Sequence, residues 1–157
     1  MRNNVYKESQ GFMTWWLGVL LVAIFSYEVY KNYHLGVAFW ILLIVIVGFL
    51  LIRLHTTIDS EGIQITFIPF AYKKKWLWNE MDEVYVRKYA ITDFGGWGYR
   101  ISGEGTAYNT KGNIGIQMVL KNGKRILIGT QYPDDVKGIL DLYFNKTNDQ
   151  ANIVSAF

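Results

Sequence analysis

The hydrophobic and polar positions of the chain divide it into two unlike parts. Leu35–Ile52 is an apolar run without a charged residue, and it ends at Arg53. A helix of ~18 residues reaches ~27 Å, close to the ~30 Å hydrocarbon core of a bilayer. A buried helix of this length in a globular protein normally carries a polar face. The pattern therefore predicts a transmembrane helix.

A second and weaker apolar run, Phe12–Tyr30, precedes the first and carries Glu28 near its end. Before it lies the polar flank Met1–Gly11, which shows no folding signal of its own. A cleaved signal peptide is the alternative interpretation of this basic start and apolar middle, but no small-residue cleavage site follows. Because the connection Lys31–His34 is short, we expect a two-helix transmembrane hairpin over residues 12–53.

The basic residues around this hairpin predict its orientation. Arg2, Lys7 and Arg53 flank one side, whereas Lys31 stands alone on the other. Cytoplasmic flanks of membrane helices carry an excess of lysine and arginine. We therefore predict an integral inner-membrane or cell-membrane protein with two spans and both termini in the cytoplasm.

After Arg53 the pattern changes to short alternating segments separated by glycine, which indicates a β-rich domain over residues 54–145, followed by a flexible tail over 146–157. Ile63, Ile65 and Phe67 alternate with polar residues and predict a half-buried strand. Alternation in Lys73–Trp78 directs Lys74 and both tryptophans to one face and the neighbouring lysines to the other.

Two further segments complete the predicted sheets before the last hairpin. Glu83–Tyr89 has the pattern of another strand. Ile91–Gly115 is rich in glycine, which favours two short irregular strands joined by flexible turns, with a functional loop as the alternative.

Ile114–Gly129 has the pattern of a β-hairpin, and its residues distinguish between two turn lengths. A two-residue turn would mix apolar and charged residues on each face. A three-residue Lys121–Gly123 loop instead aligns Met118 with Ile126 on one apolar face, and Gly123 supplies the left-handed residue. We predict the three-residue loop.

A helix is predicted to begin at Pro133, because proline suits the first helical position and Asp134 and Asp135 face the positive end of the helix dipole. Its apolar residues recur at helical spacing: Val136, Ile139, Leu140, Tyr143 and Phe144. This face should pack on the sheet.

Three segments also resemble a known family. Thr56–Ile63, Trp78–Met81 and Gly115–Thr130 are similar to bacterial pleckstrin-homology-like (PH-like) membrane proteins, and the similarity covers Leu54–Phe144. The resemblance implies a small PH-like β-barrel or sandwich, capped by a C-terminal helix and preceded by two membrane helices. The predicted fold class is therefore an α+β membrane protein with an N-terminal transmembrane helical hairpin. Related members often have an acidic residue where this chain has Tyr132, and most have no assigned activity.

Composition excludes several kinds of chemistry. Sixteen lysines and arginines against thirteen acids give a net charge of +3, too weak to indicate nucleic-acid binding. The chain has no cysteine, and its two histidines, His34 and His55, are too few for a conventional zinc site. We predict no catalytic residue, no metal site and no cofactor. The sequence does not indicate an oligomeric state.

The cluster Lys73, Lys74 and Lys75 is the single candidate contact site in the sequence, as a membrane-surface contact. A solvated strand end is the alternative. The predicted function is a membrane-anchored, non-enzymatic interaction module that presents a cytoplasmic PH-like domain to a protein partner or to membrane lipid. Two alternatives remain: an accessory subunit that stabilises a larger membrane complex, and an enzyme with its site in the glycine-rich loops 95–115.

Overall fold

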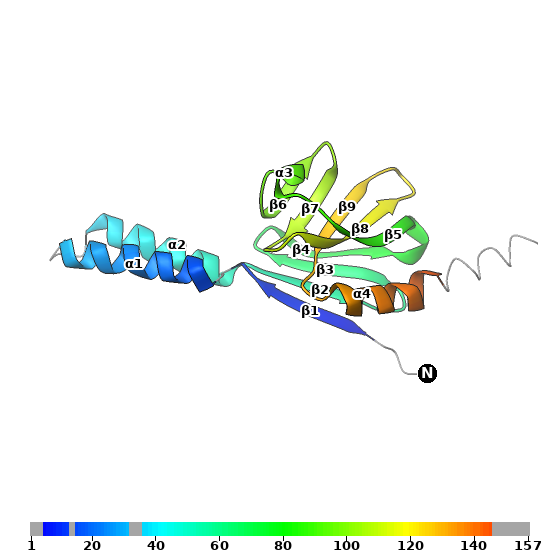
Figure 1. Cartoon of the computed structure of the whole chain (residues 1–157), viewed down its shortest axis with the longest axis horizontal. Coiled ribbons are helices and arrows are strands. Elements are labelled where there is room, and N and C mark those ends of the chain that lie inside the picture. The colour runs from blue at the N-terminus through cyan, green and yellow to red at the C-terminus, as the bar shows by residue number, and fades with distance from the viewer. Residues whose placement is uncertain (1–4, 13–14, 32–35, 146–157) are drawn as a thin grey trace, which may run out of the picture.

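The computed structural model of the chain describes residues 5–12, 15–31 and 36–145. Two helices, α1 (Trp15–Lys31) and α2 (Val37–Leu51), form a hairpin that projects from one end of a unit of two β-sheets (Figure 1). The strands are β1 (Tyr6–Gly11), β2 (Arg53–Ile58), β3 (Gly62–Ile68), β4 (Ala71–Leu77), β5 (Met81–Lys88), β6 (Gly98–Ser102), β7 (Gly105–Asn109), β8 (Ile114–Leu120) and β9 (Arg125–Gly129). The remaining helices are η1 (Trp78–Glu80), α3 (Ile91–Phe94), α4 (Pro133–Leu140) and η2 (Asp141–Asn145).

The predicted transmembrane hairpin is wrong. The helix in the apolar run Leu35–Ile52, α2, covers 15 residues, and at ~1.5 Å per residue it reaches ~22 Å, short of the ~30 Å core of a bilayer. The apolar run does not continue as helix to its end, because Arg53 already belongs to β2. In the ranges that the structure describes, no helix combines the length and the apolarity needed to cross a membrane.

This finding also overturns what depended on the hairpin. The two-span membrane localisation and the orientation inferred from it are not supported, nor is membership of the PH-like membrane proteins. The structure instead has sheets of four and five strands with short helices. The helical hairpin leaves large apolar side chains exposed on both helices, with Trp15 at 83% and Val37 at 76% exposure.

The first sheet has the order β1-β2-β3-β4, with antiparallel pairs throughout. The predicted alternation in β3 is confirmed, because Ile63, Ile65 and Phe67 are all fully buried. The strand β1 was not predicted, and it pairs with β2 from Tyr6↔Ile58 to Gly11↔Arg53. Part of the flank in which we predicted no folding signal is therefore a sheet strand.

The second sheet has the order β5-β8-β9-β7-β6, with one parallel pair, β7 with β9. The predicted hairpin is confirmed in register, because Met118 pairs with Ile126 and Ile116 pairs with Ile128. Leu120 N–H donates to the Lys124 carbonyl at 2.9 Å, which closes the three-residue loop. Gly123 has a φ of 79°, the left-handed conformation that the loop requires.

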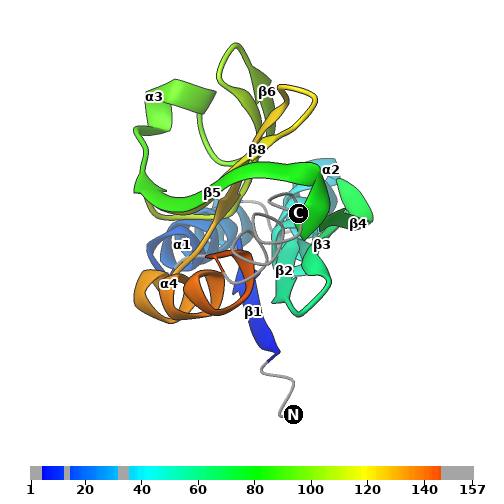
Figure 2. The ribbon, with the colours of Figure 1, turned by 90° about the vertical axis from the view of Figure 1, so that its right-hand side faces the viewer.

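The main core lies between the two sheets, and one helix packs against it. Fully buried side chains come from both sheets, including Phe67 on β3 and Met118 on β8. As predicted, α4 begins with Pro133 and contributes the buried face Val136 and Leu140, which η2 extends with Phe144. In Figure 2, α4 and β4 lie on opposite sides of the two-sheet unit.

A second, smaller core covers the outer face of the five-stranded sheet. It contains Tyr89, Phe94, Ala107 and Leu127, and Phe94 belongs to α3. The glycine-rich segment contains two strands as predicted, β6 and β7, but its short helix was not foreseen. This helix buries the part of the outer face around Ala107 and Leu127.

Candidate functional site

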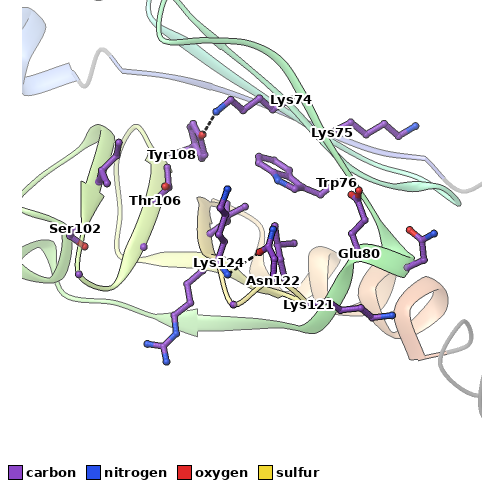
Figure 3. Close-up of a pocket in the computed structure, with 18 residues that line it drawn as sticks. Lys74, Lys75, Trp76, Glu80, Ser102, Thr106, Tyr108, Lys121, Asn122 and Lys124 are labelled. Atoms are coloured by element: carbon purple, nitrogen blue, oxygen red, sulfur yellow. Dashed lines mark hydrogen bonds between the residues drawn. The ribbon is translucent and has the colours of Figure 1, made fainter.

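A groove opens between the edge of the four-stranded sheet and one end of the five-stranded sheet, with a volume of about 1220 Å³ (Figure 3). One wall is β4 with η1. The other walls are the tips of two hairpins, the β6–β7 connection and the β8–β9 connection. The groove lies on the β4 side of the unit, and α4 lies on the opposite side (Figure 2).

The groove has a strongly basic lining. Five cationic residues line it, namely Lys74, Lys75, Lys121, Lys124 and Arg125. Glu80 is the single acidic residue among those that line it. Charged walls around a concave, partly desolvated space focus an electrostatic field, so this groove attracts anions although the net charge of the chain is only +3.

Ion pairs at the rim partly neutralise this charge. Lys75 forms an ion pair with Glu61, and Arg125 lies 3.8 Å from the Glu104 carboxylate. In Figure 3 the side chains of Lys75 and Lys121 extend away from the centre of the groove. Two other lysines therefore define its interior charge.

Lys74 reaches inward from β4 because alternation directs its side chain to the same face as Trp76. Its Nζ donates a hydrogen bond to the Tyr108 hydroxyl at 2.9 Å and lies 5.5 Å from the centre of the Tyr108 ring. The hydrogen bond to Tyr108 raises the pKa of the Lys74 ammonium, so this group is charged at neutral pH. Tyr99 adds a second ring 5.9 Å from the same Nζ.

Lys124 approaches from the opposite wall. It follows the left-handed Gly123 at the tip of the β8–β9 hairpin, and Figure 3 shows its side chain extending toward Tyr108 and Trp76. Within the part of the chain that the structure describes, neither Lys74 nor Lys124 is in an ion pair with a carboxylate. Two uncompensated ammonium groups therefore face an interior with the aromatic rings of Trp76 and Tyr108, whose centres lie 6.1 Å apart.

The edge of β4 is poorly suited to accept an additional strand. Trp78 N–H donates to the Glu61 carbonyl, so alternation of the antiparallel ladder directs the backbone groups of Lys75 and Leu77 toward the open edge. The Leu77 N–H already donates to the Glu80 carboxylate at 3.0 Å. A break in the strand register and the positive φ of Lys73, 48°, end the regular edge on the other side. Side chains, rather than strand pairing, would therefore hold a ligand here.

The three lysines that the sequence singled out have three different environments. Lys73 is exposed and has left-handed backbone, Lys74 lies in the groove, and Lys75 is paired with Glu61 at the rim. They do not form one convergent cluster. The sequence analysis missed Lys124, and the signal for it was the predicted three-residue loop that places a lysine directly after a left-handed glycine.

The glycine-rich segment also contributes to the groove, through Gly103 and Gly105 at the β6–β7 tip. Across the described residues, no group of three or more histidine, cysteine, aspartate or glutamate side chains is arranged to hold a metal ion. His55 is exposed on β2, while His34 and the tail 146–157 lie outside the described residues. The groove offers hydrogen-bond donors and aromatic rings, which suit binding of an anionic ligand.

No family model matches the chain, and no curated protein or solved structure matches it.

Proposed function

We propose that this protein is a non-enzymatic interaction module that binds an acidic segment of a partner protein in the groove between its sheets. The observation that carries the proposal is the pair of inward-facing lysines, Lys74 and Lys124, on opposite walls. Residues of β4, η1 and two hairpin tips line the groove, so it can contact several residues of a segment.

Physical considerations favour an extended acidic segment over a flat protein surface. The interior is concave and combines charge with the partly exposed ring of Trp76, so both acidic and apolar side chains of a ligand find complementary groups. The two inward ammonium groups have no ion-pair partner in the described part of the chain, so a ligand carboxylate does not have to displace one. The ion pairs at the rim fix the surrounding cations.

Fluorescence anisotropy with a labelled peptide tests the proposal. The probe is a peptide of alternating glutamate and serine, and its counterpart with lysine for glutamate is the control. We expect the intact protein to bind the acidic peptide, and the affinity to fall with added salt because charge pairs in a solvated groove are screened. The lysine peptide should not bind.

Charge-reversal variants locate the binding. Lys124→Glu should weaken the binding of the acidic peptide by about tenfold or more, since one attractive contact becomes repulsive. Lys137→Glu is the matched control, because Lys137 lies exposed on α4, away from the groove lining. Equal affinities for both peptides, or equal losses in both variants, would contradict the proposal.

A further inference from the structure

A buried tyrosine holds one of the two inward lysines in place. The Tyr108 hydroxyl accepts a hydrogen bond from Lys74 at 2.9 Å. Tyr108 is only 1% exposed, so its ring is fixed by packing between Phe67, Trp76 and Tyr99. The interior of the groove therefore presents two ammonium groups, and the Lys74 ammonium rests on a fixed hydroxyl.

This donor set suits one kind of acidic group better than another. A carboxylate carries one charge on two oxygens, whereas a phosphoryl group carries about −1.5 to −2 charges at pH 7 on three acceptor oxygens. The two ammonium groups match the second group in charge, and each carries N–H donors for its oxygens. Because the Tyr108 contact already restrains the Lys74 side chain, less rotamer entropy is lost when a ligand binds there.

We infer that the space between Lys74 and Lys124 is a subsite for a phosphoryl group on a side chain of the partner segment. This inference rests on the proposed function, since it specifies which acidic group of the segment is recognised. Trp76, on the same wall as Lys74, is placed to contact the residue next to the phosphorylated one.

Three peptides that differ at one central position test the inference on the intact protein. The position carries phosphoserine, glutamate or serine in an otherwise constant acidic sequence. We expect the phosphoserine peptide to bind about tenfold more tightly than the glutamate peptide, as one added charge-assisted contact would give. The preference should diminish below about pH 6, where the phosphoryl group takes up its second proton.

Variants assign the preference to the subsite. Lys74→Met and Lys124→Met should each reduce the preference for phosphoserine severalfold, whereas Lys137→Met should leave it unchanged. Tyr108→Phe keeps the buried ring and removes the hydroxyl that holds Lys74, so it should also reduce the preference. A circular dichroism spectrum that matches that of the parent would show that the fold of this variant is intact.

The outcomes separate the two proposals. Equal binding of phosphoserine and glutamate peptides would overturn the phosphoryl subsite and leave the acidic-segment function standing. A preference that survives in both lysine variants would also overturn the subsite. If inorganic phosphate displaces the phosphopeptide with an inhibition constant equal to the dissociation constant of the phosphopeptide, the ligand is the free ion and not a peptide segment. Failure of every acidic peptide to bind would overturn the proposed function itself.

Discussion

The Glu8 carboxylate accepts a hydrogen bond from the Thr130 hydroxyl at 2.7 Å, although the two residues are 122 positions apart in the chain. The same carboxylate accepts hydrogen bonds from the Gln131 N–H at 2.7 Å and the Tyr6 hydroxyl at 2.9 Å. Next to it, the Gln10 amide donates to the Gly129 carbonyl. Side chains of β1 thus join the first sheet to the end of β9 in the second.

Glu8→Ala should destabilise the fold markedly. Glu8 is 5% exposed, and its removal leaves the buried Thr130 hydroxyl and the partly buried Gln131 N–H without their acceptor. Hydrogen bonds to a buried charged group contribute about 1.5–3 kcal/mol each, so the loss should be about 3 kcal/mol in the free energy of unfolding. Urea denaturation measures it. Lys7→Ala on the exposed face of the same strand is the control, and an equal midpoint for both variants would contradict the argument.

Stability should decline at alkaline pH, in part through Tyr6. Burial, with a contribution from the hydrogen bond to Glu8, raises the pKa of the Tyr6 hydroxyl. Because the folded state then holds this proton more tightly than the unfolded state, the contribution is complete below the unfolded value of ~10 and is lost as the pH rises above it.

The Tyr6→Phe variant lacks the ionisable hydroxyl, so its urea midpoint should fall less between about pH 8 and pH 11 than that of the parent. Tyr72→Phe is the control, because Tyr72 is 86% exposed. Burial also raises the pKa of Tyr89, so part of the alkaline loss should remain in the Tyr6 variant. Parallel pH profiles for the parent and Tyr6→Phe would refute the assignment.

Gly105→Ala should weaken the parallel β7–β9 pair. Gly105 has a φ of 117°, and a Cβ there would lie 2.2 Å from the Arg125 carbonyl oxygen. Both the strained backbone and the clash oppose the substitution, so we expect a loss of more than about 1 kcal/mol. Gly103→Ala is the matched control at the same hairpin tip, since nothing lies within 4 Å of its Cβ position. Equal urea midpoints would show that β7 can move away from β9 without cost.

Leu140→Ala tests the attachment of α4. Leu140 is 5% exposed in the main core, and truncation of a buried leucine to alanine typically costs about 2–5 kcal/mol, a large fraction of the about 5–15 kcal/mol by which native proteins are stable. Leu142→Ala removes the same atoms from a side chain that is 41% exposed, and it should cost far less. Thermal denaturation compares them, and similar losses would mean that the helix is not held by its buried face.

The β8–β9 hairpin shows how far local pattern predicts structure here. Its register followed from the requirement that one face be apolar, and the structure has that register. The burial of the other face could not be predicted. Gln117 is buried beside Arg87 and Leu127 is buried under α3, and both of these neighbours come from distant segments of the chain. Hydrophobic alternation predicts a strand and which of its faces is buried in the main core. Whether the other face is also buried depends on tertiary contacts with distant segments.

The same limit explains the missed strand and the missed half of the site. β1 buries polar residues whose partners follow β9, so no hydrophobic alternation marks it. In the groove, alternation correctly separated Lys74 from Lys73 and Lys75, but its partner Tyr108 lies 34 positions away. The wrong prediction of a membrane hairpin had another cause. The helix length was inferred from the length of the apolar run, but α2 ends at Leu51 and the chain enters β2 at Arg53.

The helical hairpin lies within the connection between two paired strands, since Gly11 pairs with Arg53 and Phe12 N–H donates to the Ile52 carbonyl at 3.2 Å. The chain therefore leaves the sheet and returns to it at adjacent points. Loop-closure entropy grows with the logarithm of loop length, so a turn of a few residues in place of the insertion would save about 2 kcal/mol of ordering cost. The sheets should accordingly fold around a short β1–β2 turn, and since none of the residues that the structure describes in the helical hairpin lines the groove, deletion of the hairpin should leave the groove intact.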